Sequence, residues 1–477
     1  METYKFYVNG QWRESQSRQT IDIRSPYLHK TIGRVQAITQ DEVDEAIQAA
    51  RHAQKEWAKT SLQERAAVLY KWANELVNMQ DEIATVIMKE VGKGYNDAKK
   101  EAVRTADFIR YTIGEALHMN GESMMGDSFP GGSQSKLAVV QRVPLGVVLA
   151  IAPFNYPVNL AAAKIAPALM AGNAVIFKPA TQGAISGIKM IEALDKAGIP
   201  NGLLNLVTGR GSVIGDYLVE HNGIDMVSFT GGTVTGQHIA QKVKMIPLVL
   251  ELGGKDPGIV REDADLLAAA KHICSGAFSY SGQRCTAIKR VLVHEKVADT
   301  LVSLLHEEIS KLSVGSPEQN SVIVPLIDDK SADFVQGLID DAVAKGATVL
   351  MGNKREENLI YPTLLDHVTE EMSIAWEEPF GPVLPIIRVS SDDEAIRIAN
   401  ESEYGLQASI FTKDINRAFS MANSIEAGSV QVNGRTERGP DHFPFLGVKS
   451  SGMGVQGIQK SILSMTREKV TVVNITE

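Results

Sequence analysis

From Val140 onward, short apolar runs alternate with segments of helical pattern, and this alternation constrains the fold more than any other feature of the chain. Apolar strands separated by helices predict a parallel sheet that is covered on both faces. The predicted strands cover 147–152, 174–177, 203–207, 226–229 and 248–250, and the predicted helices cover 159–170, 183–196, 213–220 and 234–243. Ligands bind such sheets beyond the carboxyl ends of the strands, so the residues after each strand are the first candidates for function.

A second α/β unit is predicted after Gly253, where the alternation resumes. Asn9-Gly10 predicts a hairpin near the N-terminus, and residues from Thr39 to about Met119 have a helical pattern that begins with a capping box. The tail from Ser461 is β-prone. The predicted strands of the second unit cover 258–260, 288–293, 348–350, 384–389, 408–411 and 429–432, and two of its helices cover 298–312 and 331–345.

Charge and cysteine content exclude several classes of protein. The 477 residues have a formal net charge of −9, which argues against non-specific binding to nucleic acid or to anionic membranes. Two cysteines, Cys274 and Cys285, are too few for a disulfide scaffold or a four-thiolate zinc site, and we expect no metal. The N-terminus does not resemble a signal peptide, and no apolar run approaches the roughly 20 residues of a membrane helix. We therefore expect a cytoplasmic protein with reduced thiols.

The turns after three strands of the first predicted sheet carry residues that suit a dinucleotide. Gly209, Gly211 and Gly215 are one residue too long for the G-x-G-x-x-G fingerprint, which is weak evidence by itself. A cation close to glycine-rich helix starts suits a phosphate, because helix N-termini attract anions. Each residue alone has a simpler interpretation, a turn glycine or a solvated side chain, but the set predicts nucleotide binding. Its members are Lys178, Thr181, Arg210, Gly211, Gly215, Thr230, Gly231 and Gly232.

Cys285, Glu251 and Asn155 are the candidates for catalysis. Cys285 lies among small residues beside Arg284, which can help to stabilise a thiolate, whereas Cys274 falls at an apolar helical position and is expected in the core. Glu251 is flanked by leucines at the end of an apolar strand, where burial favours a general base. Asn155 follows the first strand and offers an amide to a developing oxyanion. These groups predict thiolate addition to an aldehyde, hydride transfer to a nicotinamide, and hydrolysis of the thioester by water that Glu251 activates.

Five segments follow one another along the chain: Phe-Asn-Tyr-Pro at 154–157, Phe-Thr-Gly-Gly-Thr at 229–233, Glu-Leu-Gly-Gly-Lys at 251–255, Gly-Gln-Arg-Cys at 282–285 and Glu-Glu-Pro-Phe-Gly-Pro at 377–382. Together they resemble the aldehyde dehydrogenase superfamily. The resemblance implies Cys285 as nucleophile, Glu251 as base for deacylation and Asn155 as oxyanion donor. It also implies cofactor contacts from Lys178, Glu378 and Phe380. Glu377 and Glu378 are not expected to act as an acid/base pair, because adjacent residues of an extended segment point in opposite directions.

The same resemblance implies a division into domains. It implies a Rossmann-like NADP-binding domain over 1–122 and 143–250, followed by an α/β catalytic domain over 251–455. A small β oligomerisation domain is expected from 123–142 and 456–477. Relatives form homodimers or homotetramers, and we expect a homotetramer.

Within this superfamily the chain most closely resembles the non-phosphorylating, NADP-dependent glyceraldehyde-3-phosphate dehydrogenases. The matching segments are Val103–Thr105, Asn155-Tyr156, Tyr280–Thr286, Tyr404–Ala408 and Thr436–Gly447. The implied reaction oxidises D-glyceraldehyde 3-phosphate to 3-phosphoglycerate without inorganic phosphate. The implied substrate contacts are Arg104, Tyr156, Arg284, Thr286 and Arg438. Several forked guanidinium donors suit a dianionic phosphate.

NADP is expected in preference to NAD. NAD-specific relatives usually carry a glutamate at the position of Thr181, and that carboxylate would repel the 2′-phosphate of NADP. Here Thr181 offers a hydroxyl, and Lys178 and Arg210 offer positive charge.

Three alternatives stay open from the sequence. Arginines also bind carboxylates, so the substrate can be another anionic aldehyde such as succinate semialdehyde. A catalytically silent member of the superfamily is disfavoured by the intact Cys285, Glu251 and Asn155. A CoA-acylating enzyme is disfavoured by Glu251, since such relatives tend to lack the deacylating glutamate.

Overall fold

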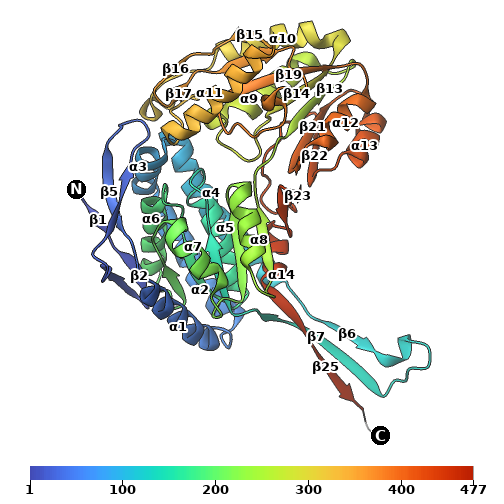
Figure 1. Cartoon of the computed structure of the whole chain (residues 1–477). Coiled ribbons are helices and arrows are strands. Elements are labelled where there is room, and N and C mark those ends of the chain that lie inside the picture. Colours follow the sequence, from blue (N-terminus) through green and yellow to red (C-terminus); the bar gives the residue numbers. More distant parts are fainter. Residues whose placement is uncertain (476–477) are drawn as a thin grey trace.

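An eight-stranded sheet forms the centre of the first unit in the computed structural model, which describes residues 1–475 (Figure 1). Its parallel strands are β8 (Val147–Ile151), β9 (Ala174–Lys178), β10 (Leu204–Leu206), β11 (Met226–Thr230) and β12 (Leu248–Glu251). Their order in space is β10-β9-β8-β11-β12, so the direction of winding reverses at β8. Open α/β sheets bind their ligands at the carboxyl ends of the strands beside such a reversal. The predicted parallel sheet is confirmed.

Short antiparallel strands extend this sheet at both edges. They are β2 (Phe6–Val8), β3 (Gln11–Arg13) and β24 (Gly452–Met453). Asn9 and Gly10 join β2 to β3 with φ angles of 52° and 77°, which a two-residue hairpin of this kind requires, and the predicted hairpin is confirmed. A separate three-stranded sheet contains β1 (Thr3–Tyr4), β4 (Thr20–Arg24) and β5 (Thr31–Gln36).

Helices pack around the first sheet. The predicted capping box of the first helix is confirmed, since the Thr39 hydroxyl accepts from the Glu42 amide and the Glu42 carboxylate accepts from the Thr39 amide. The helices are α1 (Gln40–Trp57), α2 (Leu62–Asn78), α3 (Gln80–Val91), α4 (Tyr95–Leu117), α5 (Asn159–Met170), α6 (Ala184–Lys196), α7 (Gly211–Glu220) and α8 (Thr233–Lys242). Helix α5 is buried along its whole length, which explains its nearly continuous apolar sequence.

The second unit contains a seven-stranded sheet in the order β15-β18-β19-β14-β13-β21-β22, parallel except for β15. The strands are β13 (Pro257–Val260), β14 (Arg290–His294), β15 (Thr348–Met351), β18 (Thr363–Asp366), β19 (Val383–Val389), β21 (Gln407–Phe411) and β22 (Ser429–Val432). The helices are α9 (Leu266–Phe278), α10 (Glu295–Ser310), α11 (Asp329–Ala344), α12 (Asp392–Glu401) and α13 (Ile415–Ser424). Two small ladders pair β16 (Arg355–Glu356) with β17 (Leu359–Ile360) and β20 (Tyr404–Gly405) with β23 (Val448–Lys449). The predicted second α/β unit is confirmed.

A three-stranded arm extends away from both units (Figure 1). It consists of β6 (Glu122–Met125), β7 (Lys136–Pro144) and β25 (Thr466–Asn474), in the order β25-β7-β6. Helix α14 (Ile458–Ser464) precedes the arm and belongs to the first core through Ile458 and Ile462. The predicted oligomerisation segment 456–477 thus begins with a core helix, and its residues 476 and 477 lie outside the described residues. The domain division itself stays a prediction.

Within residues 1–475, no helix combines the length and the apolar character needed to cross a membrane. The same residues contain no group of three or more His, Cys, Asp or Glu side chains arranged to hold a metal ion.

Candidate active site

The loop that carries Cys285 is held in a strained conformation. Tyr280 and Ser281 have φ angles of 52° and 55°, in the left-handed region that non-glycine residues rarely adopt. The Tyr280 hydroxyl donates to the carbonyl oxygen of Val91 at 2.7 Å, and the Ser281 hydroxyl donates to that of Val324 at 2.7 Å. These buried hydrogen bonds on both sides fix the loop that leads to the thiol.

Glu251 contacts Cys285 at the end of β12. The Cys285 Sγ donates to the Glu251 Oε1 at 3.4 Å, and the glutamate is 2% exposed. The other carboxylate oxygen, Oε2, accepts from Arg438 Nη1 at 2.7 Å and from Thr230 Oγ1 at 3.1 Å. The structure therefore brings two of the predicted catalytic residues together: Glu251 from the last parallel strand of the first unit and Cys285 from a loop of the second unit.

Burial and the Glu251 carboxylate raise the pKa of the Cys285 thiol well above its usual value. Lys289 and Arg438 are the cations that oppose this shift. Arg284, which the sequence places beside the thiol, instead donates through its guanidinium to the Gly276 carbonyl. In this arrangement the thiol is protonated near neutral pH, and Glu251 is positioned to accept its proton.

We expect iodoacetamide to alkylate Cys285 slowly at neutral pH and faster as the pH rises, because the thiolate is the reactive form. Glu251→Gln removes the carboxylate that raises the pKa of the thiol, so its alkylation profile is expected at lower pH than that of the wild type. Alkylation rates measured in the absence of substrate test this. An unchanged profile in Glu251→Gln would contradict the contact between the two side chains. Cys274 does not interfere, because burial raises its pKa to about 12.

Asn155 lies beside the nucleophile loop. Its Nδ2 donates to the Gln283 carbonyl oxygen at 3.0 Å, and the side chain is 3% exposed. Its Oδ1 is buried and has no hydrogen-bond partner among residues 1–475. The Asn155 amide is thus held against the carbonyl of Gln283, which lies two residues before Cys285 in the chain.

Four helices, α5 to α8, begin after strands of the first sheet. Carboxylates of the protein accept hydrogen bonds from the first backbone amides of two of them. Glu101 accepts from the amides of Val158 and Asn159 at the start of α5, and Glu90 accepts from those of Ile185 and Ser186 at the start of α6. Helices α7 and α8 receive no side-chain cap from the described part of the chain. Their first amides can therefore bind an external anion, as the pyrophosphate of a dinucleotide would require.

Space and charge at these two helix starts fit a dinucleotide. A Cβ atom added at Gly211, Gly215 or Gly232 would meet no heavy atom within 4 Å. Lys178, at the end of β9, is 5% exposed and donates to the Pro179 carbonyl at 3.3 Å, and burial lowers its pKa to about 8. A buried ammonium group with such modest hydrogen bonding suits a cofactor oxygen as a further partner.

The other predicted cofactor residues are distributed around this region. Glu378 accepts from the Gly254 amide at 3.2 Å and pairs with Lys289 at 2.9 Å, whereas Glu377 is exposed. Phe380 has a φ of 47°, and its ring lies 6.0 Å from that of Phe154. The remaining predicted residues lie at or shortly after the carboxyl ends of strands of the same sheet: buried Thr230 ends β11 and Gly231 follows it, while half-buried Thr181 and exposed Arg210 lie in the turns after β9 and β10.

The predicted substrate residues come from both units, and most of them are engaged. Arg104 Nε pairs with Asp441 Oδ2 at 2.8 Å. The ring of Tyr156 lies 3.6 Å from the Nζ of Lys93. Thr286 is buried beside the nucleophile, while Arg284 and Arg438 have the partners given above. Of these residues, Arg438 contacts Glu251. Arg104 lies on α4, and Tyr156 lies in the turn after β8.

A family model for the aldehyde dehydrogenase family matches residues 12–471. The chain belongs to the aldehyde dehydrogenase family. The predicted family is thereby confirmed.

Three similar proteins of the aldehyde dehydrogenase family have the same name and cover nearly the whole chain. The NADP-dependent glyceraldehyde-3-phosphate dehydrogenase of Streptococcus equinus is 52% identical over 474 residues, covering 99% of each chain. The protein of that name from Triticum aestivum is 51% identical over 476 residues, covering 99% of this chain and 96% of the relative. A crystal structure of the Bacillus halodurans C-125 enzyme of that name, complexed with NADP, is 60% identical with a TM-score of 0.99, covering 99% of this chain and 100% of that one. The predicted fold class is confirmed.

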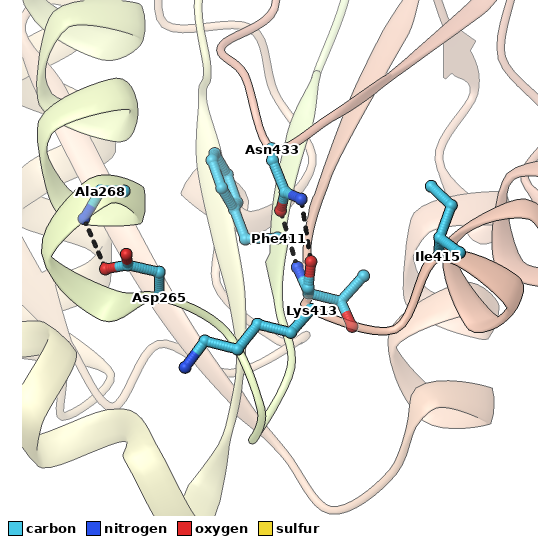
Figure 2. A pocket seen from close by; sticks show the side chains of 7 residues that line it. Asp265, Ala268, Phe411, Lys413, Ile415 and Asn433 are labelled. Atoms are coloured by element: carbon cyan, nitrogen blue, oxygen red, sulfur yellow. Dashed lines mark hydrogen bonds between the residues drawn. The ribbon is translucent and has the colours of Figure 1, made fainter.

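A hollow of about 360 Å³ lies elsewhere on this aldehyde dehydrogenase, at the carboxyl end of β21 (Figure 2). Asn433 exchanges two hydrogen bonds with the Thr412 backbone, and Asp265 caps α9 by accepting from the Ala268 amide, as Figure 2 shows. The hollow shares no lining residue with the group around Cys285, so we assign the chemistry to the cysteine site.

Besides Lys289, three polar residues of the site were not predicted from the sequence. Lys164 on α5 donates to Thr230 Oγ1 at 2.7 Å, and burial lowers its pKa to about 7. Gln456 accepts from Arg438 Nη2 at 2.7 Å, and Asp441 holds Arg104. A lone lysine in an otherwise apolar helix was the one visible signal, since such a residue is rarely buried without a role. The other two lie in loop segments whose spacing indicates no partner.

Proposed function

We propose that the chain is an NADP-dependent, non-phosphorylating glyceraldehyde-3-phosphate dehydrogenase, which oxidises D-glyceraldehyde 3-phosphate to 3-phosphoglycerate. The observation that carries the proposal is the 3.4 Å contact between Cys285 Sγ and Glu251 Oε1 in a site that fits a dinucleotide. A nucleophile and a water-activating base in one place are what oxidation followed by hydrolysis requires. The full-length relatives of this activity, 52% and 60% identical, support the substrate and the cofactor.

The residues divide the reaction into two stages. Glu251 accepts the thiol proton and passes it to solvent, and the Cys285 sulfur forms a bond to the aldehyde carbon while Asn155 donates to the oxyanion. NADP, when bound, accepts the hydride from that carbon, which leaves a thioester. Glu251 then accepts a proton from water, the water oxygen bonds to the thioester carbon, and the C–S bond breaks to return the thiolate. No step needs inorganic phosphate.

Arginines from both units provide the anion site of the proposed enzyme. Arg104, Arg284 and Arg438 are assigned to the substrate phosphate, with Tyr156 and Thr286 lining the approach to the thiol. Guanidinium groups suit a dianion because each offers a fork of donors. The net charge of −9 is therefore overridden locally.

The experiment that tests the proposal compares two aldehydes and two cofactors under identical conditions. D-glyceraldehyde 3-phosphate with NADP is expected to have the highest kcat/KM of the four combinations with succinate semialdehyde and NAD. A higher kcat/KM with succinate semialdehyde would contradict the proposed substrate and would mean that the site recognises a carboxylate in place of a phosphate. Arg284→Ala then serves to show whether the same anion site is used, since it is expected to raise KM for either aldehyde.

Thr181→Glu is expected to reverse the cofactor preference of the proposed enzyme. The new carboxylate would repel the 2′-phosphate of NADP near Lys178, and like charges in a partly buried site cost about 1–3 kcal/mol. We expect kcat/KM with NADP to fall roughly 10- to 100-fold, while kcat/KM with NAD is retained or rises. Thr181→Gln has a similar size without the charge and is the matched control. Equal loss in both variants would exclude the charge as the reason.

The arm supports the proposed homotetramer and the proposed oligomerisation domain of 123–142 and 456–477. Val470 and Val472 on β25 are more than half exposed, as is Met124 on β6, and such apolar strands call for cover by a partner chain. Val470→Lys combined with Val472→Lys is expected to lower the mass measured by light scattering from that of a tetramer. An unchanged mass would place the interface elsewhere. The free thiols of Cys274 and Cys285 support the proposed cytoplasmic location.

A further inference from the structure

Arg438 contacts two parts of the site that the reaction uses at different times. Its Nη1 lies 2.7 Å from Glu251 Oε2, and its side chain is 14% exposed. The proposed function also assigns this guanidinium to the substrate phosphate. One cation therefore lies between the base for hydrolysis and the anion site.

Two neighbours hold Arg438 in this position. Gln456 Oε1 accepts from its Nη2 at 2.7 Å, and the ring of Phe445 lies 4.8 Å from its Cζ. Gln456 and Phe445 are themselves joined by two backbone hydrogen bonds of 2.9 and 2.7 Å. The amide Nε2 of Gln456 is buried without a hydrogen-bond partner among residues 1–475. It therefore offers an anion a further donor close to the Arg438 guanidinium.

Both oxygens of Glu251 are occupied in this arrangement. Oε1 accepts from the Cys285 thiol, and Oε2 accepts from Arg438 and Thr230. When Cys285 is acylated, Oε1 loses its donor, but Oε2 keeps its hydrogen bonds from Arg438 and Thr230, which hold the carboxylate in place. Hydrolysis of the thioester requires this carboxylate to turn to the attacking water and take its proton.

We propose that Arg438 is a positioning residue that couples the anionic group of the substrate to the base for hydrolysis. In the free enzyme the guanidinium pairs with Glu251. When the acyl chain on Cys285 carries a phosphate, the phosphate takes over the guanidinium, and Glu251 is released to accept a proton from the attacking water. The water oxygen bonds to the thioester carbon, and the C–S bond breaks to return the thiolate. The inference rests on the proposed function.

This coupling places part of the substrate specificity in the second stage of the reaction. An aldehyde without an anionic group would acylate Cys285 and reduce NADP, but its thioester would hydrolyse slowly, because Arg438 stays paired with Glu251. D-glyceraldehyde is the matched probe, since it lacks the phosphate and keeps the rest of the substrate.

The test is stopped-flow measurement of NADPH formation with each aldehyde, followed by the rate constant for thioester hydrolysis. In the wild type we expect hydrolysis of the glyceryl thioester to be at least ten-fold slower than that of the phosphoglyceryl thioester. In Arg438→Met the two constants are expected to lie within about three-fold of each other, because the glyceryl thioester now hydrolyses faster than in the wild type. Arg438→Lys keeps the charge with fewer donors, and its ratio of the two hydrolysis constants is expected to lie between that of the wild type and that of Arg438→Met. Arg435→Met, which removes an arginine of the same loop that pairs with Glu437, is the control and keeps the wild-type ratio.

Two measurements keep the inference falsifiable. Phosphite, added as a free dianion, is expected to accelerate hydrolysis of the glyceryl thioester at least three-fold in the wild type and not in Arg438→Met. If Arg438→Met does not fold, Gln456→Met takes its place, because it removes the hydrogen bond that holds the Arg438 guanidinium. It is expected to reduce the ratio of the phosphoglyceryl to the glyceryl hydrolysis constant. A ratio that is unchanged in the folded variants would overturn the coupling while leaving the proposed function intact. Absence of NADPH from D-glyceraldehyde 3-phosphate in the wild type would overturn the proposed function and this inference with it.

Discussion

Cys285→Ser is expected to lower turnover by about 10⁴-fold or more while leaving NADP binding within about two-fold of the wild type. A serine hydroxyl in this site is a far weaker nucleophile than a thiolate, because its proton is much harder to remove. The proposed cofactor region consists of the carboxyl ends of the first sheet and the starts of α7 and α8, whereas Cys285 lies in a loop of the second unit, and serine keeps the size of its side chain. Turnover is measured by NADPH absorbance and binding by titration of NADP.

Cys274→Ala is the matched control for this variant. Cys274 is buried in α9 and contributes a small apolar side chain to the second unit, so its loss is expected to lower stability and to leave kcat within two-fold. Turnover retained in Cys285→Ser, or lost in Cys274→Ala, would contradict the assignment of the nucleophile.

Glu251→Gln is expected to separate the two stages of the reaction. Glutamine keeps the shape of the side chain but cannot accept a proton from water, and loss of a general base costs about 10²- to 10⁴-fold. Acylation and hydride transfer need no water, and removal of the Glu251 charge lowers the pKa of the Cys285 thiol, so that solvent can take the thiol proton in this variant. A burst of about one NADPH per site is therefore expected, followed by a steady rate reduced by that factor. Stopped-flow absorbance at enzyme concentrations near those of the substrate measures both phases.

Glu377→Gln is the control for the base, because Glu377 is exposed beside Glu378 and is assigned no contact with substrate or cofactor. It is expected to show the kinetics of the wild type. A steady rate in Glu251→Gln close to that of the wild type would exclude Glu251 as the base for hydrolysis. Loss of the burst as well as the steady rate would mean that Glu251 is required to activate Cys285.

The apolar strands and the turns after them could be predicted from the sequence because burial on both faces leaves a continuous apolar pattern. Glu251 was identified for the same reason, since a carboxylate at the end of such a strand is costly without a function. Strand β18 was missed, because Thr363–Asp366 contains two apolar residues after a proline and has no distinct pattern. The expectation of β-prone sequence from Ser461 is wrong for its first residues, because Ser461–Ser464 complete helix α14 and strand β25 begins only at Thr466.

The partners of the site residues could not be predicted, because they come from distant parts of the chain. Arg438 and Glu251 lie 187 residues apart, and neither local sequence indicates the other. The position of Arg284 beside Cys285 in the sequence indicated a thiolate partner, but neighbouring side chains in this loop point apart, and Arg284 turns to the Gly276 carbonyl. The opposing cations are Lys289, which lies four residues after Cys285, and Arg438, which only the fold brings near the thiol.

The most direct test of hydrolysis by Glu251-activated water is turnover in a buffer without inorganic phosphate or arsenate. With D-glyceraldehyde 3-phosphate and NADP, NADPH and 3-phosphoglycerate are expected in a one-to-one ratio, at a rate that added phosphate does not increase. ³¹P NMR identifies the product. A reaction that stops without phosphate, or that yields an acyl phosphate when phosphate is added, would contradict the mechanism.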